Sequence, residues 1–565
     1  MDSHEFDYIV VGAGSAGCAI ASRLSEDPQV SVCLLEAGGP DSSVLIHAPI
    51  GVAAMLPTKI NNYAYETVPQ AGLNGRKGYQ PRGKTLGGSS SINAMLYVRG
   101  HRRDYDHWAA LGNPGWSYDD VLPYFKRAEN NERLGADAFH GSGGPLNVAE
   151  LRSPSSLNEA FLRAAQAQGI PRISDCNGAE QFGCFHYQVT QKDGERCSAA
   201  KAYLTPNLAR PNLRIVIHAV SARILLDGRR ARGISYYQGR ELKEVRARRE
   251  VILSSGAFGS PQLLMLSGIG PAAELQRLAI PVACDLPGVG QNLQDHIDYV
   301  QSYRARSNTD TFGVSLRGIA RLTSAIFEWR KRRTGLVTSP FAESGAFLRS
   351  SAGVDVPDLQ LIFVVGIVDN HARTQHLGHG FSCHLTVLRP KSTGTVGLNS
   401  ADPRDAPSID PRFFAERADM EVMLKGARQM QSILEHEALA PHREKMLYPV
   451  SRDDVAQLEQ DIRNRADTQY HPVGTCRMGP DADRLAVLDA RLRVRGIEAL
   501  RVADASVMPT LIGGNTNAPT IMIGEKAADM IRQDAQRSTN SIGRTAATTG
   551  DALRSSQPDP AAVHS

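Results

Sequence analysis

Apolar and polar positions at the start of the chain follow two different periods. The run "DYIVV" (Asp7 to Val11) is short and β-rich, and "CAIASRLSED" after it carries apolar residues at helical spacing. A second apolar run, "VSVCLLE" (Val30 to Glu36), follows the helical segment. Short apolar runs predict buried strands, and a helix between two of them predicts a β-α-β unit.

Later parts of the chain combine the same patterns differently. Residues 213–255 contain four strand-like runs, and the last leads through glycine into the short helix of "SPQLLMLSGIG". Between about 301 and 464, runs such as "DLQLIFVVGIV" indicate an antiparallel sheet and "MEVMLKGARQMQSILEHEAL" a flanking helix. "LRVADASVM" from Leu500 is again strand and loop, and "APTIMIGEKAADMIRQD" is an amphipathic helix with Pro519 in its first turn. These patterns predict a mixed α/β protein.

Composition and charge narrow the class of protein. A chain of 565 residues with 42% hydrophobic and 22% charged residues is typical of a globular protein with two or three domains. A net charge of +4 gives no reason to expect a nucleic-acid partner. The eight cysteines form no CxxC pair, which argues against a zinc site or a disulfide framework. No stretch reaches the ~18 apolar residues of a membrane span, and the acidic start does not resemble a secretory signal.

Gly12, Gly14 and Gly17 form a GxGxxG motif in the context that dinucleotide binding requires. A predicted strand precedes them, a predicted helix follows, and Glu36 stands nineteen positions after the last glycine. In this motif the first glycine allows a tight turn, the second lets backbone approach a pyrophosphate, and the third lets the helix pack on the strand. The helix N-terminus then receives the phosphate charge, and Glu36 is predicted to bind ribose hydroxyls.

The motif alone does not separate NAD from FAD, but two further segments favour FAD. "PRGKTLGGSSSINAMLYVRG" (Pro81 to Gly100) is too rich in turn residues for a strand and too apolar for a linker. Such a segment indicates backbone pressed against a ligand, and the glycine-rich loop within residues 500–517 is another candidate. Several segments around one long ligand suit a tightly held flavin better than a diffusible nicotinamide.

Oxidation of an alcohol by hydride transfer needs a base for the hydroxyl proton and a donor for the developing alkoxide. His471, in "HPVGTCRMG", precedes Pro472 and is therefore held in extended backbone. Asn515, in "GGNTNAPT", lies in a glycine-rich loop that enters a helix. His471 is the candidate base and Asn515 its candidate partner, although spacing alone does not show that they meet. A zinc site of His471 with Cys476 lacks further ligands, so no metal is expected.

Taken together, these segments resemble the glucose–methanol–choline family of FAD-dependent oxidoreductases. "PRGKTLGGSSSINAMLYVRG" is similar to the family's first signature and "GAFGSPQLLMLSGIG" to its second. "HPVGTCRMG" and "LRVADASVMPTLIGGNTNAPT" complete a set of four motifs in family order, which extends the resemblance over nearly the whole chain.

The resemblance implies an α/β fold, α+β overall, with two domains. A Rossmann-like FAD-binding domain is expected from residues 1–155, 195–300 and 465–535. A substrate-binding domain with an antiparallel sheet and flanking helices is expected from residues 156–194 and 301–464. Residues 536–565 are rich in Ser, Thr, Ala, Pro and Gln, which predicts a disordered tail.

The resemblance also implies roles for individual residues. His471 matches the family's active-site histidine, the predicted base, and Asn515 matches a second catalytic position that is His or Asn among members. Some members attach FAD covalently through a histidine where this chain has Ile92, so non-covalent FAD is expected. The predicted FAD contacts are Gly12, Gly14, Ser15, Gly17, Glu36, Ala37, Arg82, Gly83, Leu86, Gly88, Ser89, Asn93, Ala94, Val220, Asp504, Ala505, Thr516 and Asn517.

The pattern most resembles bacterial alcohol dehydrogenases of the family, which implies oxidation of a primary alcohol to an aldehyde. Electrons would pass to a quinone or another non-oxygen acceptor. Choline dehydrogenase is an alternative, because Glu343 in "AESGAF" matches an active-site glutamate of choline-oxidising relatives, although a structural carboxylate is an equal interpretation. A quaternary ammonium site favours an aromatic cage, and none of the three tryptophans adjoins Glu343. Further alternatives are an oxygen-using alcohol oxidase, a hydroxynitrile-lyase-like enzyme and a non-catalytic flavoprotein.

The segment "SLRGIARLTSAIFEWRKRR" (Ser315 to Arg333) predicts a basic amphipathic helix. Such a helix either lies on an anionic membrane, near a quinone pool, or is an ordinary helix of the substrate-binding domain with a solvated basic end. Since the sequence shows neither a secretory signal nor a membrane span, we expect a cytoplasmic location, with peripheral contact at the inner membrane through this helix as the alternative.

Overall fold

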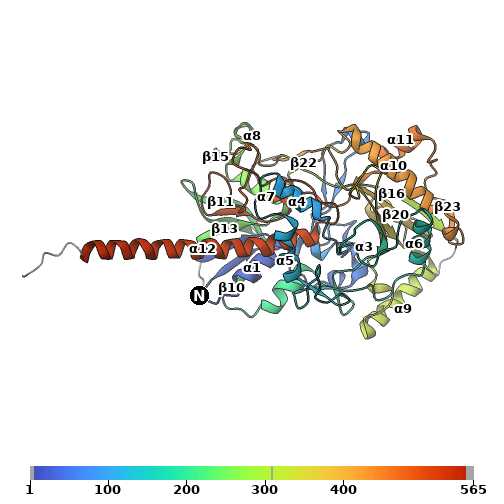
Figure 1. The fold of residues 1–565 in the computed structure, drawn as a ribbon, viewed down its shortest axis with the longest axis horizontal. Helices are drawn as coiled ribbons and strands as arrows, with labels where there is room; N and C mark the ends of the chain where they lie inside the picture. Colours follow the sequence, from blue (N-terminus) through green and yellow to red (C-terminus); the bar gives the residue numbers. More distant parts are fainter. Residues whose placement is uncertain (1–4, 307–309, 555–565) are drawn as a thin grey trace, which may run out of the picture.

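The computed structural model describes residues 5–306 and 310–554, and the side chains of the last helix up to Arg537. Most strands belong to two large sheets, which lie in different halves of the molecule (Figure 1). One sheet is largely parallel and the other antiparallel, and helices pack on both. The mixed α/β class predicted from the sequence is therefore confirmed.

The first sheet joins strands from three distant parts of the chain. β1 pairs in parallel with β2 on one side and with β13 on the other, and β25 pairs with β13. β2 is fully buried and β1 nearly so, as expected for parallel strands that are covered by helices. Helix α1 packs against β1, β2 and α12. The strands are β1 (Glu5–Val11), β2 (Val32–Leu35), β10 (Leu213–Val216), β11 (Ala219–Asp227), β12 (Arg230–Gln238), β13 (Glu241–Leu253) and β25 (Leu500–Val502).

The second sheet is antiparallel, and the period of two along its strands decides which side chains reach the centre of the molecule. In β19, Leu361 and Phe363 pack into a core with helices α6 and α10. The alternate residues Ile362 and Val364 lie on the opposite face and line a cavity. The strands are β7 (Gly183–His186), β16 (Ile297–Ala305), β17 (Gly313–Val314), β18 (Ala342–Leu348), β19 (Leu359–Val364), β20 (Gly378–Val387), β23 (Arg443–Met446) and β24 (Asp467–Thr468).

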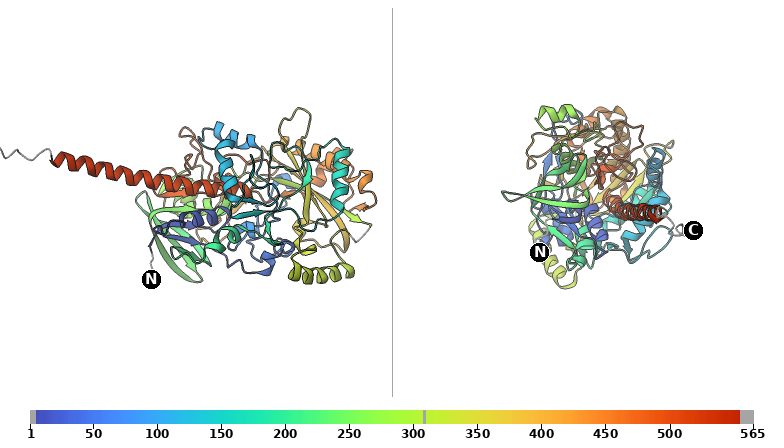
Figure 2. Two further views of the ribbon diagram at one scale, coloured as in Figure 1. Left: turned by 60° about the horizontal axis from the view of Figure 1, so that its bottom comes forward. Right: turned by 90° about the vertical axis from the view of Figure 1, so that its left-hand side faces the viewer.

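Helices cover these sheets and close the molecule at its edges. Figure 2 shows α12 extending away from the body at one end, while α9 lies along the outer edge near the other. The principal helices are α1 (Ser15–Leu24), α4 (Arg102–Ala110), α5 (Tyr118–Ala128), α6 (Leu157–Ala167), α7 (Gly256–Leu266), α8 (Ala272–Arg277), α9 (Leu316–Arg332), α10 (Arg417–Leu434), α11 (Val455–Arg465) and α12 (Asn517–Arg554). The shorter α2 (Val44–His47) and α3 (Val52–Met55) lie close to each other.

Two segments lie at the domain boundaries expected from the sequence, and these boundaries stay predictions. β24 pairs with β16 of the second sheet, although residues 465–535 are expected in the FAD-binding domain, so the predicted division crosses one short strand. α12 extends to Arg554 and so spans residue 536, where the predicted disordered tail begins. Residues 555–565 are outside the described residues.

No helix in the described ranges is both long and apolar enough to cross a membrane.

Candidate active site

A continuous cavity of about 1740 Å³ receives residues from both sheets. This volume exceeds the ~300–1,000 Å³ of ordinary small-molecule sites, so the cavity has room for a dinucleotide together with a substrate. Most residues that the sequence predicts for the cofactor and for catalysis line it: Gly12, Gly14, Ser15, Glu36, Ala37, Arg82, Gly83, Gly88, Ser89, Asn93, Ala94, Val220, Asp504, Ala505, Thr516, Asn517, His471 and Asn515.

The three motif glycines occupy three different environments. Gly12 has φ +98°, and a Cβ on it would lie 2.5 Å from the backbone oxygen of Ser254. A Cβ on Gly17 would collide with the backbone oxygen of Gly12, so Gly17 serves helix packing and does not line the cavity. A Cβ on Gly14 would meet no protein atom closer than 3.8 Å, because this residue faces the open cavity. Of the three, only Gly14 is limited by no close protein atom, and its open side faces the cavity.

Glu36 lies at the end of β2, where the predicted ribose contact is expected. Its carboxylate accepts hydrogen bonds from the N–H groups of Ala13, at 2.9 Å, and Gly38, at 2.7 Å. Burial raises the pKa of Glu36 to about 7. The two backbone donors orient the carboxylate at the cavity wall and leave it further lone pairs for hydroxyl donors.

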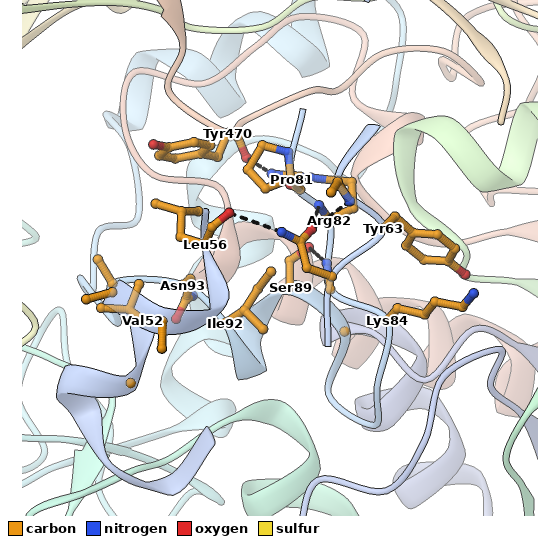
Figure 3. A pocket seen from close by; sticks show the side chains of 18 of the residues that line it. Val52, Leu56, Tyr63, Pro81, Arg82, Lys84, Ser89, Ile92, Asn93 and Tyr470 are labelled. Carbon is orange, nitrogen blue, oxygen red and sulfur yellow. Dashed lines mark hydrogen bonds between the residues drawn. The ribbon is translucent and has the colours of Figure 1, made fainter. Parts of the chain in front are cut away.

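The loop of residues 81–100 is pressed against the glycine turn. A Cβ on Gly88 would lie 2.8 Å from the Cα of Gly14, so the two motifs touch through backbone alone. Figure 3 shows Arg82, Ser89 and Asn93 of this loop beside the cavity. Behind it, the buried guanidinium of Arg196 donates to Asn93 Oδ1 at 2.8 Å and to the Asn93 carbonyl at 2.7 Å. Arg196 carries no motif signal, and sequence reasoning missed it.

Asp504 connects the C-terminal loop to the middle of the chain. Its Oδ2 accepts hydrogen bonds from the N–H of Gly256, at 2.8 Å, and from Ser260 Oγ, at 2.6 Å. These contacts hold the first turn of α7 against the loop after β25. Leu86, another predicted cofactor contact, does not line the cavity. It packs instead into the hydrophobic core around the first sheet.

The two predicted catalytic residues meet at the cavity wall. Asn515 Nδ2 lies 3.2 Å from His471 Nε2, although the residues are 44 positions apart. Gln360, on the cavity-facing side of β19, donates to Asn515 Oδ1 at 3.0 Å. This contact turns the NH₂ group of Asn515 toward His471.

A second histidine, His296, fixes the position of the proton on His471. Nε2 of His296 lies 3.0 Å from the carbonyl oxygen of Leu388, and because a carbonyl only accepts, this nitrogen carries a proton. Burial lowers the pKa of His296 to about 4, so its ring is neutral and its Nδ1 is an acceptor. His471 Nδ1 lies 2.9 Å from that acceptor and must donate. The neutral His471 ring therefore carries its lone pair on Nε2, beside Asn515.

The register of the second sheet explains this arrangement. Asp298 of β16 stands opposite Thr386 of β20, so continuing the antiparallel register places His296 opposite Leu388. β24 pairs along β16, and the chain after it leads directly to His471. No periodicity of residue types marks these positions, which is why the sequence did not reveal His296.

The environment of His471 disfavours its charged form. Burial, together with the neighbouring His296 and Arg82, holds the pKa of His471 well below 6.5. The ring is therefore neutral at physiological pH, with an unprotonated Nε2.

Contacts to the backbone hold the His471 segment in place. The N–H of His471 donates to Asp295 Oδ1 at 2.9 Å, and Arg82 donates to the carbonyl of Tyr470 at 2.6 Å (Figure 3). Tyr470 has φ +73°, a left-handed conformation that is uncommon outside glycine. Gly474 has φ +90°, and a Cβ there would lie 2.5 Å from a backbone oxygen. Such strain persists where the surroundings fix the backbone, as around functional residues.

Glu343 lies outside the cavity lining. Its buried carboxylate accepts hydrogen bonds from the N–H of Ser155 at 2.8 Å, from Asn158 at 2.6 Å and from Ser339 at 2.5 Å. These donors fasten the start of α6 to β18. The contacts favour the structural interpretation of Glu343 over the substrate role.

The described residues contain no group of three or more His, Cys, Asp or Glu side chains that could hold a metal ion.

Comparison with known proteins decides the family. Residues 6–298 match the N-terminal GMC oxidoreductase model, and residues 390–524 match the C-terminal one. The chain belongs to the GMC oxidoreductase family. The cofactor of this GMC oxidoreductase is FAD, and the cavity volume, the open side of Gly14 and the buried Glu36 fit such a group.

Relatives extend over almost the whole length of this GMC oxidoreductase. It is 46% identical over 531 residues to alcohol dehydrogenase (acceptor) of Pseudomonas putida, covering 93% of this chain and 95% of that protein. It is 44% identical over 537 residues to mitochondrial choline dehydrogenase of Homo sapiens, covering 94% and 90%. The structure of pyridoxine 4-oxidase from Mesorbium loti matches with a TM-score of 0.84 at 32% identity, covering 94% of this chain and 99% of that one. A formate oxidase from Aspergillus oryzae RIB40 matches with a TM-score of 0.88 at 30% identity, covering 95% and 100%.

Gly14 faces the open cavity, unlike the crowded Gly17, so a larger residue at position 14 should impair cofactor binding without disturbing the fold. Gly14→Val should fold, because its φ of −78° is allowed for any residue and its Cβ meets no close protein atom. The added side chain should obstruct the bound FAD, so the flavin content of the purified protein should fall at least tenfold. Flavin absorbance per chain and circular dichroism measure the two effects.

Gly353→Ala is the matched control, because Gly353 has open space around it and lies away from the cavity. Its flavin content should equal that of the wild type. Full flavin occupancy in the Gly14→Val protein would contradict the placement of the cofactor beside Gly14.

Proposed function

We propose that this GMC oxidoreductase oxidises a primary alcohol to an aldehyde, with His471 as the base and a quinone or another non-oxygen acceptor as the final oxidant. The observation that carries the proposal is the unprotonated Nε2 of His471 at the cavity wall, held 3.2 Å from the Asn515 amide. The similarity to alcohol dehydrogenase (acceptor) supports the reaction class.

The protein's part of the reaction follows from these two side chains. The hydroxyl of the alcohol lies on the cavity side of the His471–Asn515 pair, within reach of both side chains, and Nε2 accepts its proton. The positive charge that this proton brings is shared through His471 Nδ1–H with the acceptor nitrogen of His296. Asn515 Nδ2 donates a hydrogen bond to the oxygen as it becomes alkoxide-like. Bound FAD supplies the acceptor for the hydride from the α-carbon.

FAD attachment is proposed to be non-covalent. Ile92 lines the cavity at the position where some relatives have the attaching histidine, and a branched aliphatic side chain forms no bond with the flavin. The cofactor would be held by the glycine turn, the loop of residues 81–100 and the Asp504 loop, which together surround the cavity.

The cavity wall favours an uncharged alcohol over choline. The part of the cavity wall that the second sheet forms includes the apolar side chains of Ala342, Ile362 and Val364. The acidic residues of the lining are Glu36, Glu66, Asp405 and Asp504, and among the described residues none of the second sheet's carboxylates reaches it. Because Glu343 is occupied by three protein donors, a quaternary ammonium group finds no counter-charge on that wall.

An alcohol panel tests the proposed reaction. With a soluble quinone-like dye as acceptor, primary aliphatic alcohols should give a kcat/KM at least tenfold above that of choline. Oxygen consumption under the same conditions should stay below a tenth of the dye rate. Choline as the best substrate would point to the choline-oxidising alternative, and rapid peroxide formation would point to an oxidase.

Removing the base should cost a large part of the rate. His471→Ala should lower kcat/KM by about 10²–10⁴-fold, the usual contribution of a general base. His107→Ala, on the exposed face of α4, is the matched control and should leave the rate unchanged.

The pH profile provides a second readout of the same base. Only the neutral form of His471 accepts a proton, and its pKa lies below 6.5, so kcat/KM should stay level down to pH 6.5 and fall at lower pH. A loss of less than tenfold in His471→Ala, or an acidic limb centred above pH 6.5, would argue for another base.

A further inference from the structure

Helix α9 exposes most of its large apolar side chains to solvent. Leu316 is 90% exposed, Phe327 68% and Ile319 60%, whereas only Ala325 and Trp329 are buried. Leu316, Ile319 and Phe327 recur at helical spacing and therefore share one stripe. These exposed fractions show that the stripe faces solvent, and Figures 1 and 2 show α9 along the outer edge of the molecule.

A neighbouring strand pair widens the stripe into a patch. Val314 of β17 forms a bridge with Leu377, and these side chains are 43% and 76% exposed. We call Val314, Leu316, Ile319, Ile326, Phe327 and Leu377 the α9 patch. Large contiguous apolar patches on a soluble surface mark places where another molecule or a membrane binds.

The cavity reaches the surface at this patch. Val314 and Ile326 belong to the patch and also line the cavity, as does the neighbouring Leu322 of α9. The buried Trp329 lines the cavity from the inner side of the same helix. One helix therefore forms both a wall of the cavity and the apolar surface beside its opening.

Charge on the same helix indicates what covers the patch. α9 contains five basic residues and one acidic residue, and Arg330, Lys331 and Arg332 lie exposed in its last turn. A second copy of the chain would bring two such basic helices together in a symmetric interface, which repulsion disfavours. A surface with acyl chains beneath anionic headgroups complements both the apolar stripe and the basic end.

We propose that the α9 patch docks the holoenzyme on an anionic phospholipid bilayer, and that a lipid-soluble quinone enters the cavity across α9. This inference rests on the proposed function only for the identity of the acceptor. In that step the quinone takes two electrons and one proton from the reduced cofactor and the second proton from His471, which took it from the alcohol, and leaves as quinol while the cofactor returns to its oxidised state.

Vesicle flotation of the holoenzyme tests the docking. Wild-type protein should float with phosphatidylglycerol vesicles and remain largely unbound with phosphatidylcholine vesicles. The double variant Leu316→Asp, Phe327→Asp should lose at least tenfold in binding to the anionic vesicles. Leu208→Asp, Leu242→Asp is the matched control, because these side chains are 61% and 55% exposed and do not belong to the patch.

Two activity assays separate this inference from the proposed function. Both double variants should keep wild-type alcohol oxidation with a soluble dye, which shows that they fold and bind FAD. With a long-chain quinone in phosphatidylglycerol vesicles, the patch variant alone should lose at least tenfold in rate. Absence of dye activity in the wild type would count against the proposed function, and flotation would still decide the docking.

Three results would overturn the inference: a wild-type protein that does not float with anionic vesicles, a patch variant that floats as well as the control, or a patch variant with an unchanged quinone rate in vesicles. A wild-type dimer that becomes monomeric in the patch variant, with flotation unaffected, would assign the patch to a second copy of the chain.

Discussion

The hydrogen bond from His296 Nε2 to the carbonyl of Leu388 is the constraint on which the active site depends. It fixes one proton, and in a neutral His296 ring the later proton positions follow from it: His296 Nδ1 accepts, His471 Nδ1 donates, and His471 Nε2 stays unprotonated and faces the Asn515 amide. A backbone carbonyl is a suitable start for this series of hydrogen bonds, because it accepts hydrogen bonds at every pH. The register between β16 and β20 sets this contact, so the antiparallel sheet determines which nitrogen of His471 can act as a base.

The cofactor half of the cavity depends on close backbone approach. Gly12 and Gly17 are small because protein atoms leave no room, while Gly14 is small because the cavity side must stay open. The loop of residues 81–100 touches this turn at Gly88 and is braced from behind by Arg196. Segments that are hundreds of residues apart therefore surround one ligand, and the reactive end of that ligand can lie beside His471 and Asn515.

The sequence allowed much of this arrangement to be predicted, for identifiable physical reasons. Apolar runs and helical spacing predicted the β1-α1-β2 unit, and the glycine motif with Glu36 predicted the nucleotide-binding end. The pairing of His471 with Asn515 was implied by family resemblance, since spacing carries no information about contacts between distant loops. His296, Gln360 and Arg196 were missed because sheet register and burial, which position them, leave no local pattern.

Other differences have equally local causes. Glu343 matched a motif position, but three protein donors occupy its carboxylate. The amphipathic pattern of residues 315–333 predicted helix α9, yet the pattern could not show that the apolar stripe faces outward. Side-chain periodicity reports that a helix has an apolar face, and only the packing around it reports what that face contacts.

The tautomer of His471 is the most direct test of whether the His296 contact makes Nε2 of His471 the base. ¹⁵N NMR of the FAD-bound enzyme with labelled histidine, assigned by comparison with a His471→Gln protein, would report both ring nitrogens at pH 7.5. The hydrogen bonds from Leu388 through His296 predict a neutral His471 ring with the proton on Nδ1 and an unprotonated Nε2. A proton on Nε2, or an imidazolium at that pH, would contradict it.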